Sequence, residues 1–129
     1  MAATPESKAK LKVKRLIETV AAERGIPYYL RSNAAGGVGF ANGTPDFTLY
    51  WRVGNTAMPI ELEIKAGHGT PTPLQLAILS KCMAAGAHGF VIWGDHTPDL
   101  VFLEKFLRRV TPVMNITGKF DKAEQELSW

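Results

Sequence analysis

The spacing of apolar residues along the chain changes between helical and strand-like patterns. Three segments repeat apolar residues every three or four positions, which is the spacing of one buried helix face: residues 5–24, 72–86 and 99–110. Four shorter segments are apolar, aromatic or alternating, which is typical of strands: residues 28–33, 46–53, 58–65 and 88–93. The order predicts an α/β protein with a mixed β-sheet flanked by helices, αβββαβ followed by a last helix.

Turn and capping residues mark where two of the helices begin and end. Gly25 ends the first helix, and Pro27 prevents its continuation. The second helix opens at Thr72, and Gln75 completes a Thr-x-x-Gln capping box. Capping alone therefore explains Gln75. A helix that begins beside a phosphate site also turns its free N–H groups toward that site, so the two roles are compatible.

The connections between the strands predict how the sheet is assembled. Residues 54–57 form a hairpin-like turn, so the first three strands are expected to be antiparallel neighbours. A helix separates the third strand from the fourth, so the fourth should return parallel to the third. Residues 88–93 form an uninterrupted apolar run, which predicts a strand in the centre of the sheet.

Composition fits one globular domain spanning residues 1–129. The chain is 46% hydrophobic and long enough to bury a core. No apolar run has the length of a membrane span and no secretory signal opens the chain, so we expect a soluble protein without a membrane partner. The one cysteine, Cys82, cannot form an internal disulfide, which favours an intracellular location.

Positive charge is concentrated on the first predicted helix. The net charge of +3 and the isoelectric point of about 9.1 favour a polyanionic partner. The candidate DNA-binding residues lie on this helix or just before the glycine-rich loop 34–43: Lys8, Lys10, Lys12, Lys14, Arg31 and Asn33. A solvated helix face explains the lysines equally well. The loop is either a long connection or a place where the DNA backbone approaches closely.

Two acidic residues and a lysine lie on two neighbouring predicted strands. Asp46 opens the second strand, and Glu63 and Lys65 end the third. Strand side chains alternate, so Glu63 and Lys65 share one face, and Asp46 could bring a second carboxylate to Glu63. Two carboxylates suit Mg²⁺ or Mn²⁺, and an adjacent lysine can stabilise a developing negative charge. A half-solvated strand with charges on one face is the alternative explanation.

The order of these residues resembles a known nuclease family. Three motifs carry the resemblance: Gly43-x-Pro45-Asp46, Glu63-x-Lys65-x-Gly67 and Thr72-Pro73-x-Gln75. Together they are similar to the VRR-NUC (virus-type replication-repair nuclease) family of the PD-(D/E)xK nuclease superfamily, over roughly residues 10–95. The resemblance implies a restriction-endonuclease-like core.

The resemblance also implies a role for each motif residue. Asp46, Glu63 and the carbonyl oxygen of Ile64 are implied as metal ligands. Lys65 is implied as the catalytic lysine, and Gln75 as a supporting residue of the active site. The implied cofactor is Mg²⁺ or Mn²⁺.

The first helix departs from the family pattern. The family usually places a glutamate there, pointing into the site. The aligned position is Lys14 or a neighbour, and the nearest acidic candidate is Glu18, one turn later on the same helical face. The occupancy of a second metal therefore stays open.

The chain is thus predicted to be a metal-dependent endodeoxyribonuclease that recognises DNA structure, such as branched or Holliday-junction DNA, rather than sequence. The resemblance is consistent with a phage enzyme of the bacterial cytoplasm and implies a homodimer. Residues 111–129 carry apolar side chains without a place in the core and are expected to join the dimer interface. The alternative is a non-catalytic nucleic-acid-binding module, which Lys14 favours and the intact Asp46, Glu63 and Lys65 oppose.

Overall fold

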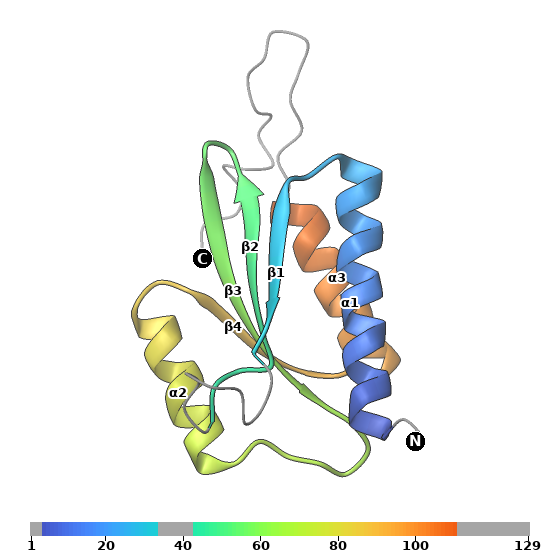
Figure 1. Cartoon of the computed structure of the whole chain (residues 1–129), viewed down its shortest axis with the longest axis vertical. Coiled ribbons are helices and arrows are strands. Elements are labelled where there is room, and N and C mark those ends of the chain that lie inside the picture. Colours follow the sequence, from blue (N-terminus) through green and yellow to red (C-terminus); the bar gives the residue numbers. More distant parts are fainter. Residues whose placement is uncertain (1–3, 34–42, 111–129) are drawn as a thin grey trace, which may run out of the picture.

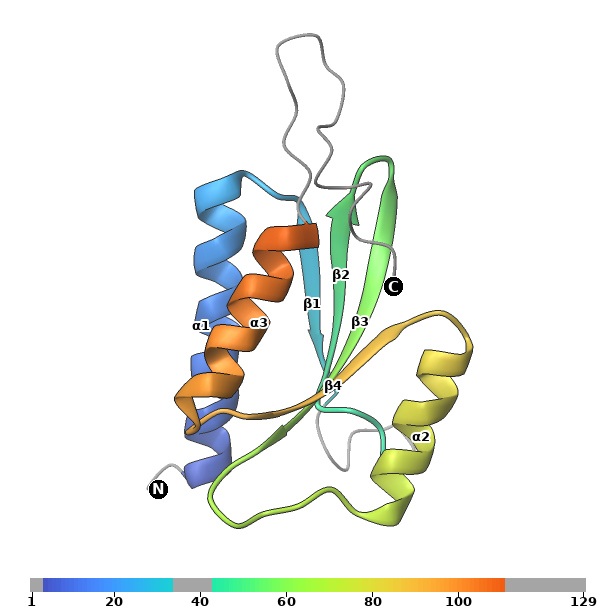
Figure 2. The same cartoon turned by 180° about the vertical axis from the view of Figure 1, so that it is seen from behind.

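The computed structural model describes residues 4–33 and 43–110 of the chain. Its elements are α1 (Pro5–Arg24), β1 (Tyr28–Ser32), β2 (Phe47–Val53), β3 (Thr56–Lys65), α2 (Pro73–Ala84), β4 (His88–Trp93) and α3 (Thr97–Val110). The strands form one sheet in the order β1-β2-β3-β4. Helices α1 and α3 lie side by side on one face of the sheet, and α2 packs on the other face against β3 and β4 (Figures 1 and 2).

This arrangement confirms the predicted α/β class and the mixed sheet. Strands β1, β2 and β3 form an antiparallel meander, and β4 pairs in parallel with β3 after the crossover through α2. The register places Leu49 opposite Ile60, and Ile64 opposite Ile92. The predicted boundaries of the helices and strands agree closely with the observed ones.

Strand β4 lies at an edge of the sheet, so the prediction of a central strand was wrong. Helices cover both faces of this strand, which explains its continuous apolar sequence. Gly89 lies against Leu79 and Met83 of α2, whereas the next residue, Phe90, packs edge-on against Phe106 of α3. An edge strand that is buried on both faces has the same apolar pattern as a central strand.

The main core lies between the sheet and the helices α1 and α3. Alternate residues of β2 and β3 point into this layer and meet the inner faces of the two helices. Its fully buried residues include Leu49, Trp51, Ile60, Leu62, Ile64, Val13, Ile17, Val20, Leu103 and Leu107. The residues between them in each strand therefore face the opposite side of the sheet, where β3 carries Glu61, Glu63 and Lys65.

Two predicted features lie outside the described residues. They are the glycine-rich loop, apart from Gly43, and the segment 111–129 to which a dimer interface was assigned. Both stay predictions. Among the helices in residues 4–33 and 43–110, none combines the length and the apolar character that crossing a membrane requires.

The chain passes close to α1 directly after β4. A Cβ atom at Gly94 would lie 2.5 Å from the Cβ of Ala9 and 2.7 Å from both its Cα and its carbonyl oxygen. The Gly94 N–H also donates to the carbonyl of Lys65 at 2.9 Å. This contact fixes the first turns of α1 beside the carboxyl ends of β3 and β4, which leaves no room for a side chain at position 94.

Gly94→Ala is therefore expected to lower the free energy of unfolding by about 1–3 kcal/mol, because backbone atoms must move to admit a methyl group. Chemical denaturation would measure the loss. Ser80→Ala, at an exposed position of α2, is the control and should change stability by less than about 0.5 kcal/mol. A Gly94→Ala protein as stable as the wild type would show that α1 is not held by this contact.

Candidate metal centre

Carboxylates from three separate parts of the chain meet at one end of the sheet. Glu6 comes from the first turn of α1, Asp46 directly precedes β2, and Glu63 lies near the end of β3. One oxygen from each carboxylate lies within 4.8 Å of the others. Glu63 is buried, and Glu6 and Asp46 are half-buried. Oxygens that converge in this way can bind one divalent cation together.

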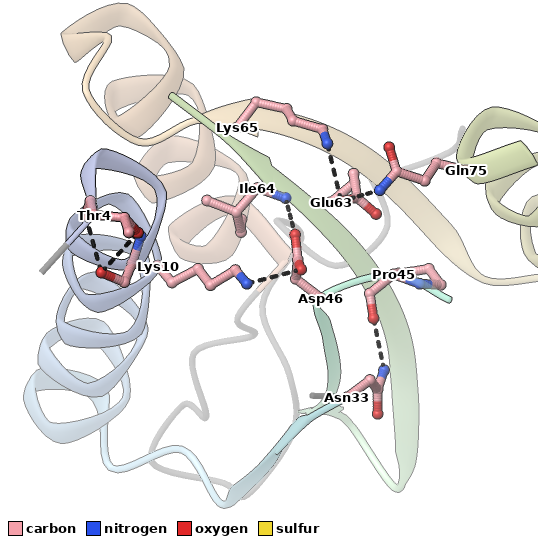
Figure 3. A network of polar contacts seen from close by, with 10 residues as sticks. Thr4, Lys10, Asn33, Pro45, Asp46, Glu63, Ile64, Lys65 and Gln75 are labelled. Atoms are coloured by element: carbon pink, nitrogen blue, oxygen red, sulfur yellow. Dashed lines mark hydrogen bonds and ion pairs between the residues drawn. The ribbon is translucent and has the colours of Figure 1, made fainter. Parts of the chain in front are cut away.

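Backbone hydrogen bonds hold Asp46 from two directions (Figure 3). The Ile64 N–H of β3 donates to Oδ2 of Asp46 at 2.7 Å. From β1, the Asn33 N–H donates to the Asp46 carbonyl at 2.9 Å, and the Asn33 side-chain amide donates to the Pro45 carbonyl at 3.0 Å. The Asp46 carboxylate is therefore fixed against β3.

Glu63 is buried with one of its oxygens unpaired. Its Oε1 accepts a hydrogen bond from Nε2 of Gln75 at 3.3 Å and lies 3.8 Å from Nζ of Lys65 (Figure 3). Its Oε2 has no hydrogen-bond partner among the described residues, and the residue is only 2% exposed. Leaving a carboxylate oxygen buried and unpaired is costly, so this atom is available as a ligand.

The electrostatics of the three carboxylates favour a cation. Burial raises the pKa of Glu63 to about 8, and the neighbouring carboxylates of Asp46 and Glu6 raise it as well, against the opposing charge of Lys65. A negative charge this close disfavours the ionised form of Glu63. A bound divalent cation reverses this effect, since it stabilises all of the ionised forms at once.

Glu6 is the carboxylate of α1 that lies in this cluster, whereas Glu18 was the candidate predicted from the sequence. Thr4 caps α1, its Oγ1 accepting from the Ser7 N–H at 3.1 Å, and this cap sets Glu6 in the first turn. Glu18 lies about 18 Å further along the helix at 1.5 Å per residue and is exposed. The structure thus replaces Glu18 with Glu6.

A signal for Glu6 was present in the helical pattern. Glu6 precedes Ala9 by three residues and Val13 by seven, so it continues the buried stripe of α1 toward the N-terminus. A carboxylate in the line of a buried helix stripe must have a partner, which makes it a candidate ligand. Lys14, the position aligned with the family's glutamate, is exposed.

Lys10 is the one predicted DNA-binding lysine of α1 that points into the site. Its Nζ lies 3.2 Å from Oδ1 of Asp46 (Figure 3). Lys8, Lys12 and Lys14 are exposed. Lys10 follows Glu6 by one turn, so the helix delivers a carboxylate and an ammonium group to the same place.

Arg31 and Asn33 belong to an internal network rather than to an open surface. The Arg31 guanidinium donates from Nε to Oδ1 of Asn33 at 2.8 Å and from Nη2 to Oγ1 of Thr48 at 3.3 Å. The Thr48 hydroxyl donates to Glu61 at 2.8 Å. Burial raises the pKa of Glu61, against the hydrogen bond from Thr48 and the charge of Arg31. Asn33 is 4% exposed, so its observed role is to hold the Asp46 segment.

Gln75 takes part both in the helix cap and in the site. The predicted capping box is confirmed: Oε1 of Gln75 accepts from the Thr72 N–H at 2.8 Å, and Oγ1 of Thr72 accepts from the Gln75 N–H at 3.1 Å. The remaining amide nitrogen donates to Glu63. The cap thereby orients Gln75 toward Glu63.

Comparisons with known proteins identify the fold. No protein-family model matches the sequence, and no curated protein matches it. The structure is similar to a solved structure described as a "VRR_NUC domain", with 20% sequence identity, a TM-score of 0.60, and coverage of 80% of this chain and 97% of that chain. The chain therefore has the mixed-sheet, restriction-endonuclease-like fold that the resemblance implied.

The raised pKa of Glu63 predicts that the metal-free protein loses stability as pH rises. Glu63 keeps its proton in the folded state up to about pH 8, whereas an unfolded glutamate releases it near 4.5. The folded state binds more protons in this window, so the free energy of unfolding should fall between these two pH values. Glu63→Gln is neutral at every pH and should remove this decline.

Thermal unfolding in EDTA, followed across pH 5 to 9, would test this. Above pH 8 the Glu63→Gln protein should be more stable than the wild type by about 1 kcal/mol or more, the equivalent of one pKa unit. Glu18→Gln, at an exposed position of α1, is the matched control and should follow the wild type. A constant difference between Glu63→Gln and the wild type over the whole range would contradict the raised pKa.

Proposed function

We propose that this protein is a metal-dependent nuclease that hydrolyses phosphodiester bonds in DNA. The observation that carries the proposal is the meeting of Glu6, Asp46 and Glu63 beside Lys65, within a fold similar to a VRR_NUC domain. The net charge of +3 and the exposed lysines of α1 support a polyanionic substrate. Branched DNA is the proposed substrate class.

The donor set suits Mg²⁺ or Mn²⁺, which prefer oxygen ligands. Glu6, Asp46 and Glu63 would hold the ion, and the unpaired Oε2 of Glu63 fits this role. Strand geometry supports the Ile64 carbonyl as a further ligand. The Ile64 N–H faces Asp46, and the carbonyl of the next residue, Lys65, bonds to Gly94 at the other edge of β3. The N–H and the carbonyl of one strand residue point to the same edge, so the Ile64 carbonyl faces Asp46 too.

The side chains around the carboxylates would each have a separate role in the reaction. When bound, the metal ion would polarise a phosphoryl oxygen and lower the pKa of the attacking water. Lys65 would orient that water or stabilise the negative charge that develops on the phosphate. Gln75 keeps the Glu63 carboxylate oriented through Oε1. Lys10, which now pairs with Asp46, would be released to contact the phosphate once a cation neutralises that carboxylate.

The carboxylate of the first helix and the number of sites in each chain both bear on the proposal. The alternative of a binding module without catalysis drew its support from the missing carboxylate of the first helix, and Glu6 removes that support. The described residues of a chain carry one such set, so cutting a junction symmetrically requires two copies related by a twofold axis. A homodimer is therefore part of the proposal.

Removing single carboxylates should abolish cleavage. Glu6→Gln, Asp46→Asn and Glu63→Gln are each expected to reduce the cleavage rate about 100-fold or more, since each removes charge from the group that holds the metal. Plasmid, linear duplex and four-way-junction DNA, incubated with Mg²⁺ or Mn²⁺ and separately with EDTA, would provide the assay. EDTA should stop cleavage of every substrate.

Two variants sharpen this test. Glu61→Gln is the matched control, because Glu61 shares the strand face of Glu63 but bonds to Thr48, and it should retain most of the activity. Lys65→Ala should lose cleavage while it keeps its affinity for DNA in Ca²⁺, which separates a nuclease from a binding module. Wild-type cleavage by Glu63→Gln would refute the proposed site.

The exposed basic face of α1 should contribute phosphate contacts. Lys8, Lys12 and Arg15 follow one another at helical spacing on one exposed side. Changing all three to Gln is expected to flatten the dependence of log affinity on log salt concentration by about 0.9 per lost contact. Fluorescence anisotropy with duplex DNA would measure the slope. Lys10 is left unchanged, because it pairs with Asp46.

A triple variant with the same change in net charge is the control for this measurement. Lys81, Lys105 and Arg109 are exposed on α2 and α3, and their change to Gln should leave the slope close to the wild-type value. Equal flattening by both triple variants would show that net charge, not the face of α1, determines the affinity.

A further inference from the structure

Two tyrosines form an exposed stacked pair on the face of the sheet opposite α1 and α3. Tyr29 of β1 and Tyr50 of β2 are direct cross-strand partners. Their ring centroids lie 6.3 Å apart with an interplanar angle of 14°, and the residues are 60% and 37% exposed. They line an open depression of about 330 Å³, whose polar side includes Arg52 and Asn55. The face thus offers flat aromatic surface and hydrogen-bonding groups together.

This pair lies on the same face of the sheet as the proposed catalytic residues. Tyr50 is paired with Pro59 of β3, and alternate residues from there lead to Glu61, Glu63 and Lys65. Four residues of a strand span about 13 Å, which is the length of about four stacked nucleotides at 3.4 Å each. A DNA strand whose phosphate lies at Glu63 could therefore reach the tyrosines with nearby bases.

Charge favours a nucleic-acid strand as the occupant. Arg52 forms no ion pair with any carboxylate of the described chain, and its Nε donates to the Gly54 carbonyl at 3.0 Å, which holds the guanidinium near the depression. A guanidinium without a carboxylate partner is suited to a phosphate. The bases of an intact duplex are stacked on one another, so an exposed aromatic face selects bases that are unpaired.

We propose that Tyr29, Tyr50 and Arg52 bind unpaired nucleotides of the DNA substrate, a few nucleotides from the bond that is cut. The inference rests on the proposed nuclease function and adds the class of substrate: DNA in which the strands separate beside the cleavage site. The tyrosine rings stack with bases, and Arg52 contacts the phosphate backbone. Duplex DNA without a branch does not engage the two tyrosines.

The test compares two DNA ligands in Ca²⁺. Fluorescence anisotropy of the full chain is measured with a labelled oligo-dT strand and with a blunt duplex of the same length. The double variant Tyr29→Ala/Tyr50→Ala should bind the single strand about 5- to 150-fold more weakly, the loss of stacking on about one base, and bind the duplex with unchanged affinity. Phe102→Ala, an exposed aromatic of α3, is the control and should change neither affinity.

A conservative variant separates stacking from a structural role of the pair. Tyr29→Phe/Tyr50→Phe retains the rings and should bind the single strand like the wild type. Unchanged single-strand affinity in the double alanine variant, or an equal loss with both ligands, would overturn the proposal. If the alanine variant does not fold, Arg52→Gln replaces it. This variant should also bind the single strand more weakly and the duplex with unchanged affinity. Unchanged single-strand affinity, or an equal loss with both ligands, would again overturn the proposal.

Cleavage assays distinguish this inference from the proposed function. The tyrosine variants should cut linear duplex at the wild-type rate and lose activity only on forked or branched DNA. If the wild-type protein cleaves none of the substrates, the nuclease function is refuted. The affinity measured for the single strand is not affected by that outcome. Equal loss of duplex and forked cleavage in the tyrosine variants would refute the substrate class while the nuclease function stands.

Discussion

The close approach of three carboxyl groups determines how the residues around them are arranged. Glu6, Asp46 and Glu63 meet within 4.8 Å, and Glu63 is buried with an unpaired oxygen. Such a group raises the energy of the folded protein unless cations or donors surround it. Two lysines, the amide of Gln75 and the Ile64 N–H take up these positions. The cluster lowers the stability of the metal-free protein, and a bound cation would offset this loss.

The fold allows this cluster to form because it brings the ends of separate helices and strands to one place. Thr4 and Thr72 each cap a helix whose first turn faces the site, and helix N-termini favour negative charge. The close approach of Gly94 to Ala9 holds α1 at the required position. Asn33 ties β1 to the segment before β2. The position of each carboxylate thus depends on a contact that is distant from it in the sequence.

The sequence predicted those parts of the candidate site that depend on patterns of neighbouring residues. Asp46, Glu63 and Lys65 lie at strand ends, where alternation fixes the side of each residue, and Gln75 belongs to a capping signature. Glu6 was missed because its partners come from another element, and only the continuation of a buried stripe pointed to it. The burial of Asn33 and the edge position of β4 follow from tertiary packing, which apolar patterns do not encode.

The division of β3 into two faces explains why these features occur together. Ile60, Leu62 and Ile64 build the core, while Glu61, Glu63 and Lys65 carry the polar face. A shift of one residue in the register would exchange the two sets and bury every charge in the core. The register is therefore fixed from both ends, by the hairpin between β2 and β3 and by the bond from Ile64 to Asp46. The bond that positions a ligand thus also holds the strand in register, so that in this sheet the geometry of the site and the integrity of the core have the same cause.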